Sequence, residues 1–480
     1  MIPLIAAILC ALVIWQLFRL NREREVQTSK ALWIPTFWLF IAASRNVSAW
    51  LHYSSGGGSQ YLEGSPLDRA VLSAALALGV IVLLGRTQRV WMLLRSNLPI
   101  LVYFLYCGIS VLWSDFPDVS FKRWFRALGD VVMVLIVLTD PNWPVALRRF
   151  LARVGNVVVP LSIVFIRYFP QLGRSYTTGG AGTWTGVGTD KNALGMISMA
   201  FGLASIFRFL QLYRERKNAR RTGPLIAQGA MIVMTSYLLY EAHSATALAC
   251  FFLAGIPMVL TFLFQWARRP AIVHVMVFGA LGVACSALFL DIGSGMVETL
   301  GRDMTLTGRT SIWHFALTLV QNPLFGSGFE SFWVGPRLAE MERLIHQTVN
   351  QAHNGYIEVF LNLGWVGVAL LSVLLITAYV RIAAAVRWGA PAASLRLAYF
   401  IVAVAYNFTE ASFKMMGLVW IALLLMMMAP QAFLQGYSPP LSLDQADNLG
   451  ESKQKATRVV VLAGRHLAHN VRRKDLLRTR

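Results

Sequence analysis

Long apolar runs constrain this chain more than any other feature of its sequence. About thirteen of them approach the roughly 20 mostly apolar residues that a membrane-spanning helix needs. They lie near residues 2–18, 31–51, 70–84, 98–113, 125–139, 154–169, 192–212, 224–242, 245–266, 271–291, 355–380, 397–412 and 416–434. The pattern predicts an all-α fold, a polytopic transmembrane helix bundle of about 12–13 helices.

The composition agrees with lipid as the solvent. The 480 residues are 56% hydrophobic and 14% charged, whereas soluble domains carry about 25% charged residues. A net charge of +20 would indicate nucleic acid in a soluble protein, but the basic residues here sit in short connecting loops, so no nucleic-acid partner is expected. The four cysteines fall inside apolar runs without pair spacing, and neither a disulfide framework nor a metal site is expected.

The connecting loops alternate in charge. Those after the odd-numbered runs are rich in Lys and Arg, as is the tail from residue 436 on, and the positive-inside rule places them in the cytoplasm. The first run lacks a charged n-region and a cleavage site and reads as a retained helix. The expected division is into N-terminal transmembrane helices (1–291, about ten), an outer active-site loop (292–352), C-terminal transmembrane helices (353–435, about three) and a flexible basic cytoplasmic tail (436–480).

The long outer loop contains a short amphipathic segment, residues 310–321. Its apolar residues recur at helical spacing and Asn322-Pro323 ends it, so we expect a helix lying on the membrane surface. Arg309 falls on the apolar side with Trp313, where a cation needs a partner. Two readings stay open: Arg309 snorkels to lipid phosphates, or it meets an anionic ligand with Trp313 closing one side of the site.

Two ionisable residues mark the start of the helix that follows this loop. His353 lies near the outer rim, where a histidine can take a proton from a hydroxyl or simply cap the helix. Glu358 lies further in, and a carboxylate in an apolar run is costly enough to expect a partner, either His353 or an arginine. Gly326-Ser327-Gly328 is expected to turn and bring backbone N–H groups close to a ligand, and Gly364 and Gly367 to allow close helix contact.

The order of these short motifs resembles the signature loop of the O-antigen ligase and polymerase family, in its exopolysaccharide production branch. The residues that carry the resemblance are Gly308-Arg309-x-x-x-Trp313, Asn322-Pro323-x-x-Gly326-x-Gly328, His353-Asn354-x-x-x-Glu358 and Leu363-Gly364-x-x-Gly367, with Leu112-Trp113-Ser114-x-x-Pro117, Phe169-Pro170-x-x-Gly173-Arg174 and Asp190-Lys191-Asn192 upstream. At Asp190, relatives often have histidine, so no role is carried over for that position.

The resemblance implies a glycosyltransferase of the bacterial inner membrane, multi-pass, with its active site facing the periplasm. The donor would be an undecaprenyl-diphosphate-linked glycan, and the acceptor a hydroxyl of a glycan or a lipid-linked glycan. His353 matches the histidine that activates this hydroxyl, and Arg309 matches the loop arginine. Arg167 or Arg174 with Lys191 could complete a phosphate cradle. Neither a metal nor another cofactor is implied, and the partners are membrane lipids and a chain-length regulator or export protein.

The predicted enzyme polymerises repeat units of an exopolysaccharide or O-antigen. The nearest alternative is a ligase that moves finished glycan to a lipid A core. From another class, the chain could be a lipid-linked sugar transporter or flippase, although its charges collect at the outer rim rather than at the bilayer midplane. The cluster Lys122-Arg123-Arg126 could contact lipid headgroups or the donor.

Overall fold

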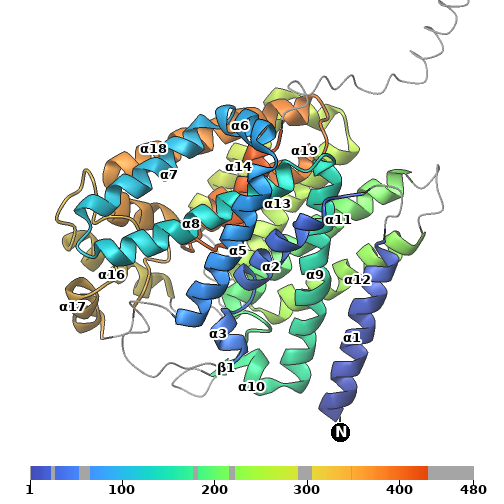
Figure 1. Ribbon diagram of the computed structural model, residues 1–480, viewed down its shortest axis with the longest axis horizontal. Helices are drawn as coiled ribbons and strands as arrows, with labels where there is room; N and C mark the ends of the chain where they lie inside the picture. Colours follow the sequence, from blue (N-terminus) through green and yellow to red (C-terminus); the bar gives the residue numbers. More distant parts are fainter. Residues whose placement is uncertain are drawn as a thin grey trace, which may run out of the picture. The chain divides into compact units, whose positions relative to one another are not determined.

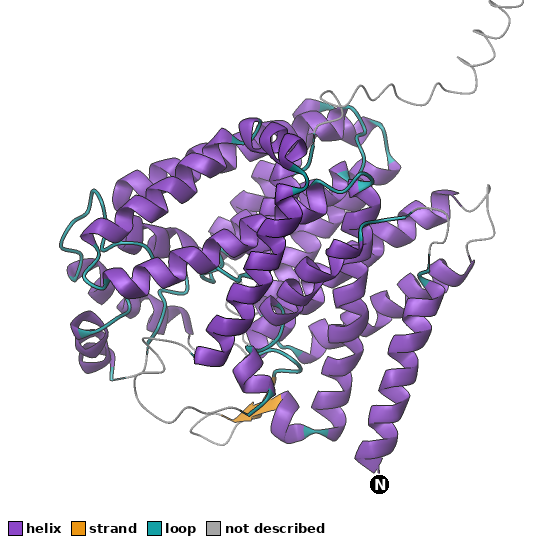
Figure 2. Cartoon of the chain, in the orientation of Figure 1, coloured by secondary structure: helices purple, strands orange, loops and turns teal. Residues whose placement is uncertain are grey.

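The structure of this protein is a computed structural model that describes residues 2–22, 27–52, 65–176, 182–215, 222–289, 305–346 and 349–430. The described residues are almost entirely helical (Figures 1 and 2), which confirms the predicted all-α class. Residues Met1–Ala429 form one compact unit. The predicted cytoplasmic tail, 436–480, lies outside the described residues.

Each of the predicted apolar runs overlaps at least one helix, although the run 31–51 is divided among η1, α2 and α3, and the run 397–412 extends beyond α19. In chain order the elements are α1 (Ile2–Leu20), η1 (Lys30–Leu32), α2 (Trp33–Ala42), α3 (Val47–Trp50), α5 (Pro66–Leu84), α6 (Thr87–Arg95), α7 (Leu98–Ile109), η2 (Ser110–Trp113), α8 (Pro117–Leu138), α9 (Trp143–Tyr168), α10 (Pro170–Gly173), β1 (Arg174–Tyr176), β2 (Gly182–Trp184), α11 (Lys191–Glu215), α12 (Thr222–Glu241), α13 (Ala245–Leu263), η4 (Trp266–Arg268), α14 (Pro270–Phe289), α16 (Thr305–Thr318), α17 (Pro336–Ile345), α18 (Gly355–Arg387), α19 (Ala393–Tyr406) and α20 (Leu418–Met428). The strands β1 and β2 pair antiparallel, with Ser175 opposite Thr183.

Among the described residues, 7 helices are long and apolar enough to cross a membrane alone: α1, α5, α9, α11, α12, α13 and α18. The pair of α6 with α7 and η2 is bent by 90° and forms either one further, broken span or a re-entrant loop. The helices α2, α14, α19 and α20 are apolar but shorter. Large side chains on the outer faces are exposed, among them Ile81, Val275 and Phe278. An apolar surface of this extent needs lipid around it, so the chain is a multi-pass membrane protein.

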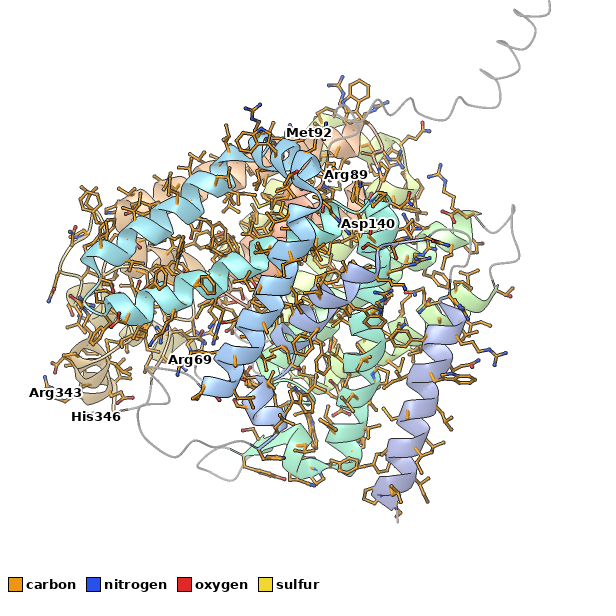
Figure 3. The ribbon with its side chains drawn as sticks, viewed as in Figure 1. Arg69, Arg89, Met92, Asp140, Arg343 and His346 are labelled. Carbon is orange, nitrogen blue, oxygen red and sulfur yellow. The ribbon has the colours of Figure 1, made fainter. Side chains whose placement is uncertain are left out.

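In Figure 1, α1, α5 and α9 run steeply between two ends of the described bundle, whereas α7, α8 and α18 lie at a slant to them. In Figure 3, Arg89, Met92 and Asp140 lie at one end, and Arg69 and Arg343 lie at the other. Arg381 of α18 donates to Asn97 Oδ1, in the connection between α6 and α7, at 2.7 Å. We call the end with Arg69 the site end.

Helix α18 is broken near its start, and the long loop forms hydrogen bonds with the backbone groups that the break leaves free. Gly364 has φ 63° and ψ −165°, a conformation that interrupts the helical hydrogen bonds. The freed carbonyls of Leu361 and Asn362 accept from the backbone N–H groups of Ser327 and Gly328, at 3.1 and 2.9 Å. Unpaired backbone groups are costly in a membrane, so this pairing fixes the loop against α18.

This geometry corrects two predictions about glycines. The N–H groups of Ser327 and Gly328 are engaged by α18, and therefore do not face a ligand. A Cβ on Gly364 would lie 2.3 Å from the Leu324 carbonyl oxygen, so the close contact at this glycine is with the loop and not with another helix.

The amphipathic segment of the loop is also placed differently from the prediction. It forms α16, and its apolar residues Ile312, Phe315 and Leu319 pack on a small protein core that includes Ala316, Phe332 and Met341. Its apolar face is therefore covered by α17, α18 and the loop between them, rather than being left to the membrane surface.

Candidate functional site

Glu410 is the centre of a polar cluster at the site end. It lies in the short connection between α19 and α20, and its side chain is only 9% exposed. Its Oε1 accepts from Arg309 Nη2 at 3.1 Å and from Asn192 Nδ2 at 2.9 Å. Its Oε2 lies 3.5 Å from His353 Nδ1. One carboxylate thus joins the two residues that the sequence singled out, although they lie on different segments.

His353 is held at this position by its local backbone. Asn354 caps α18, because its Oδ1 accepts from the N–H groups of Tyr356 and Ile357. His353 immediately precedes the cap and has φ 51°, an unusual value for a residue with a side chain. Gln351 Nε2 lies 3.3 Å from His353 Nδ1, and Lys414 donates to Gln351 Oε1 at 2.8 Å. The imidazole is one-third exposed, with 33% of its side-chain area accessible, so it can reach a substrate.

Trp313 and Glu358 both form hydrogen bonds with the backbone of Ala352, the residue before His353. Trp313 Nε1 donates to the Ala352 carbonyl at 2.7 Å, and Glu358 Oε1 accepts from the Ala352 N–H. Trp333 Nε1 donates to both carboxylate oxygens of Glu358, at 3.0 and 2.9 Å. The sequence predicts substrate-binding roles for both residues, with Trp313 closing one side of the site and Glu358 pairing with His353 or an arginine. The carboxylate of Glu358 instead pairs with Trp333 and the Ala352 N–H. The structure shows that each already has protein partners, and that together they fix both backbone groups of Ala352.

A cavity of about 660 Å³ opens beside this cluster. Gln351 and Lys414 line it, which connects it to His353. Its wall carries five cations and two carboxylates: Arg69, Lys122, Arg123, Arg126, Lys414, Asp190 and Glu330. We call it the basic cavity. An excess of guanidinium and ammonium groups around a space of this size favours a polyanionic ligand.

The acids of the basic cavity do not cancel its charge. Asp190 caps α11, because its Oδ1 accepts from the N–H groups of Asn192 and Ala193 at 2.9 Å. Burial raises the pKa of the Glu330 carboxyl, while Lys414 and Arg123 partly oppose this increase. Arg123 donates to the Glu330 backbone carbonyl. The cavity is therefore positive on balance.

The other predicted phosphate-binding residues, Arg167, Arg174 and Lys191, do not lie together in one site. Arg167 donates to Glu241 at 2.8 Å and to the Tyr237 hydroxyl at 2.6 Å, in a group separate from Glu410. Arg174 donates to the Ile166 carbonyl and lies 4.2 Å over the Trp184 ring. Lys191 begins α11 directly before Asn192. The structure therefore brings Arg309, His353 and the neighbour of Lys191 together, and gives Arg167 and Arg174 other partners.

Glu410 was not predicted from the sequence, and for the basic residues at the start of α8 the sequence leaves open a contact with lipid headgroups or with the donor. Glu410 fell inside the predicted apolar run 397–412, where an ionisable residue is costly. The same criterion that singled out Glu358 would have found it. Arg69 gave no such signal, because it is an ordinary charge near a predicted helix start. Among the described residues, no group of three or more His, Cys, Asp or Glu is arranged to hold a metal ion.

The fold and this cluster define a class: a multi-pass membrane protein with a polar centre and a basic cavity at one end of the bundle. A family model described as O-antigen ligase (Wzy_C) matches residues 229–372. That range contains Arg309, His353 and Glu358, and it ends before Glu410. The match supports a relationship of this part of the chain to the O-antigen ligase and polymerase family.

One curated relative has a similar sequence over a longer range. It is the exopolysaccharide production protein ExoQ of Rhizobium meliloti (strain 1021), 27% identical over 297 residues. The matched region covers 59% of this chain and 65% of the relative, slightly less than two thirds of its length.

Proposed function

We propose that this protein is a glycosyltransferase that moves a glycan from a polyprenyl-diphosphate-linked donor to an acceptor hydroxyl. The observation that carries the proposal is the meeting of Arg309 and His353 at Glu410, beside the basic cavity. A diphosphate is a polyanion that such a cavity can bind, and a membrane-embedded enzyme can take its donor from the bilayer. The family resemblance implies that the carrier is undecaprenyl diphosphate and that the reaction takes place on the periplasmic side.

In the proposed reaction, His353 is the general base. Two groups face His353 Nδ1: Glu410 Oε2 at 3.5 Å accepts from a protonated Nδ1, whereas Gln351 Nε2 at 3.3 Å donates to an unprotonated one. In the tautomer with the proton on Nδ1, the Gln351 amide turns away, and Nε2 is free to accept the proton of the acceptor hydroxyl. The acceptor oxygen forms a bond to the anomeric carbon of the donor, and the bond from that carbon to the diphosphate oxygen breaks. The diphosphate leaves as an anion, and the cations of the site stabilise its charge.

Glu410 has two roles in this scheme. It favours the tautomer of His353 with the proton on Nδ1, and it stabilises the imidazolium that forms when the hydroxyl proton arrives. It also orients Arg309 through Oε1. A guanidinium has five N–H donors, so Arg309 can bind a phosphate oxygen while keeping its bond to Glu410.

We favour polymerisation of an exopolysaccharide, which the family resemblance implies, and the similar protein ExoQ is an exopolysaccharide production protein. A ligase that transfers finished chains to another acceptor uses the same donor chemistry. The test is a deletion strain complemented with the wild type, with His353→Ala, or with Arg343→Ala. Arg343→Ala is the control, because it removes an exposed side chain on α17. Lipid-linked glycans are then extracted and measured by mass spectrometry.

We expect His353→Ala to abolish polymer while the protein accumulates normally, and Arg343→Ala to behave as the wild type. Accumulated single repeat units would identify a polymerase, and full-length chains stranded on the lipid carrier would identify a ligase. Wild-type polymer in the His353→Ala strain would refute the proposed function. Translocation of labelled lipid-linked sugar in liposomes, unaffected by His353→Ala, would support a flippase instead.

A further inference from the structure

A second, smaller hollow lies on the far side of the loop that walls the basic cavity. It has a volume of about 110 Å³ and lies between η2, the end of α16 and the start of α17. We call it the rim pocket, and the residues that matter for its chemistry are Trp113, Asp115, Gln321, Asn322, Phe332 and Arg337. We propose that the rim pocket binds one sugar ring of the glycan chain, away from the reacting bond. This inference rests on the proposed function.

The two spaces share one wall. Phe332 lines the rim pocket and Trp333 lines the basic cavity, with ring centroids 5.1 Å apart. At the start of α8 the same division recurs, because Asp115 lines the rim pocket and Val119 the basic cavity. A glycan longer than one sugar that reacts in the basic cavity could therefore extend over this wall into the rim pocket.

The charge of the rim pocket differs from that of the basic cavity. Its acid and its cation form an ion pair, Arg337 with Asp115, and the Arg337 guanidinium also lies 5.6 Å over the Phe332 ring. A balanced pair does not attract a polyanion as five cations do. It offers carboxylate acceptors and guanidinium donors side by side, which suits hydroxyl groups that both donate and accept. The buried Arg337 Nη1 has no hydrogen-bond partner in the described structure.

The remaining groups fit a sugar as well. Gln321 is exposed and offers an amide that can both donate and accept. Asn322 Oδ1 accepts from the N–H groups of Leu324 and Phe325, which leaves its Nδ2 group to donate. Trp113 is held by Tyr106 and Phe325, at ring distances of 5.9 and 5.7 Å, and its Nε1 lies 3.3 Å from the Phe325 carbonyl. A fixed, half-buried indole is a flat apolar surface for the C–H face of a sugar.

The test uses the purified full-length protein in detergent and size-fractionated oligosaccharides of one to four repeat units, released from the polysaccharide that the host strain secretes. Binding is measured by saturation-transfer difference NMR and by titration. The variants are Gln321→Ala, Trp113→Ala and Trp113→Phe, with Arg343→Ala as the control on α17. Loss of one hydrogen bond or of the aromatic surface should weaken binding at least about fivefold.

Trp113→Phe keeps an aromatic surface but loses the indole N–H, and it should retain most of the binding that Trp113→Ala loses. In cells, Gln321→Ala and Trp113→Ala should shorten the polymer without accumulating unreacted donor to the level seen in His353→Ala. Wild-type fragment binding in both Gln321→Ala and Trp113→Ala would refute sugar binding in the rim pocket, but would not contradict the proposed function. Fragment binding that depends on the rim pocket, with unchanged polymer in His353→Ala, would refute the proposed function alone.

Discussion

Arg309 Nη2 lies 3.1 Å from Glu410 Oε1, and these residues are 101 positions apart in the chain. Arg309 comes from α16 in the long loop, and Glu410 from the connection between the last two described helices. Because the other oxygen of Glu410 faces His353, this carboxylate fixes the distance between the predicted phosphate ligand and the predicted base.

The first prediction concerns the geometry of Arg309. Arg309→Lys keeps one positive charge that can pair with Glu410, but an ammonium lacks the planar, paired donors that also meet a phosphate. We expect less than about a tenth of wild-type polymer, with normal amounts of protein in the membrane. Secreted polysaccharide and immunoblots of membranes measure the two quantities. Arg343→Lys is the matched control, and near wild-type polymer in Arg309→Lys would show that charge alone is sufficient.

The second prediction concerns Glu410. In Glu410→Gln, an amide N–H₂ can turn towards His353 Nδ1 and favour the tautomer with its proton on Nε2, which cannot accept from a hydroxyl. We expect kcat to fall about 100-fold or more while the KM for lipid-linked donor changes little. Glu241→Gln, a carboxylate that pairs with Arg167 elsewhere at the site end, should behave as the wild type. A large rise in KM with an unchanged kcat would instead place Glu410 in donor binding.

The third prediction concerns the break in α18. Gly364→Ala places a side chain where the backbone is essentially restricted to glycine and where the Leu324 carbonyl leaves no space, so it should destabilise the protein by at least about 2 kcal/mol. A Cβ on Gly229, in α12, meets nothing within 4 Å, and Gly229→Ala should leave the melting temperature unchanged or raise it. Thermal unfolding in detergent measures both, and equal melting temperatures would show that the break is not required.

The fourth prediction concerns pH. Burial raises the pKa of Glu330 above the value of 4.5 expected in the unfolded chain. In the window between these two pKa values the folded protein holds a proton that the unfolded chain has released, so stability falls as pH rises through the window. Glu330→Gln removes this titration. Its melting temperature should therefore depend less on pH and exceed that of the wild type near neutral pH.

The control for this prediction is Glu340→Gln. Glu340 is an exposed residue whose pKa is lowered by its hydrogen bond to Arg343, so its small contribution to stability has the opposite dependence on pH. It should not remove the fall in stability above pH 4.5. An unchanged pH profile in Glu330→Gln would show that Glu330 is not responsible.

Much of the fold followed from the sequence because a membrane helix is specified by its own apolar residues. The runs around α5, α9 and α13 need only length and composition to be recognised. His353 and Arg309 could be singled out because polar residues are rare between such runs.

Only the tertiary structure decided which polar groups meet. Glu410 belongs to a different part of the chain from Arg309, and nothing in the local sequence of either residue specifies the other. The cations of the basic cavity come from α5, α8 and the segment before α20, so they form a site only when these elements pack together. Local sequence determines a helix because its hydrogen bonds are local, whereas a binding site depends on long-range packing that no single segment encodes.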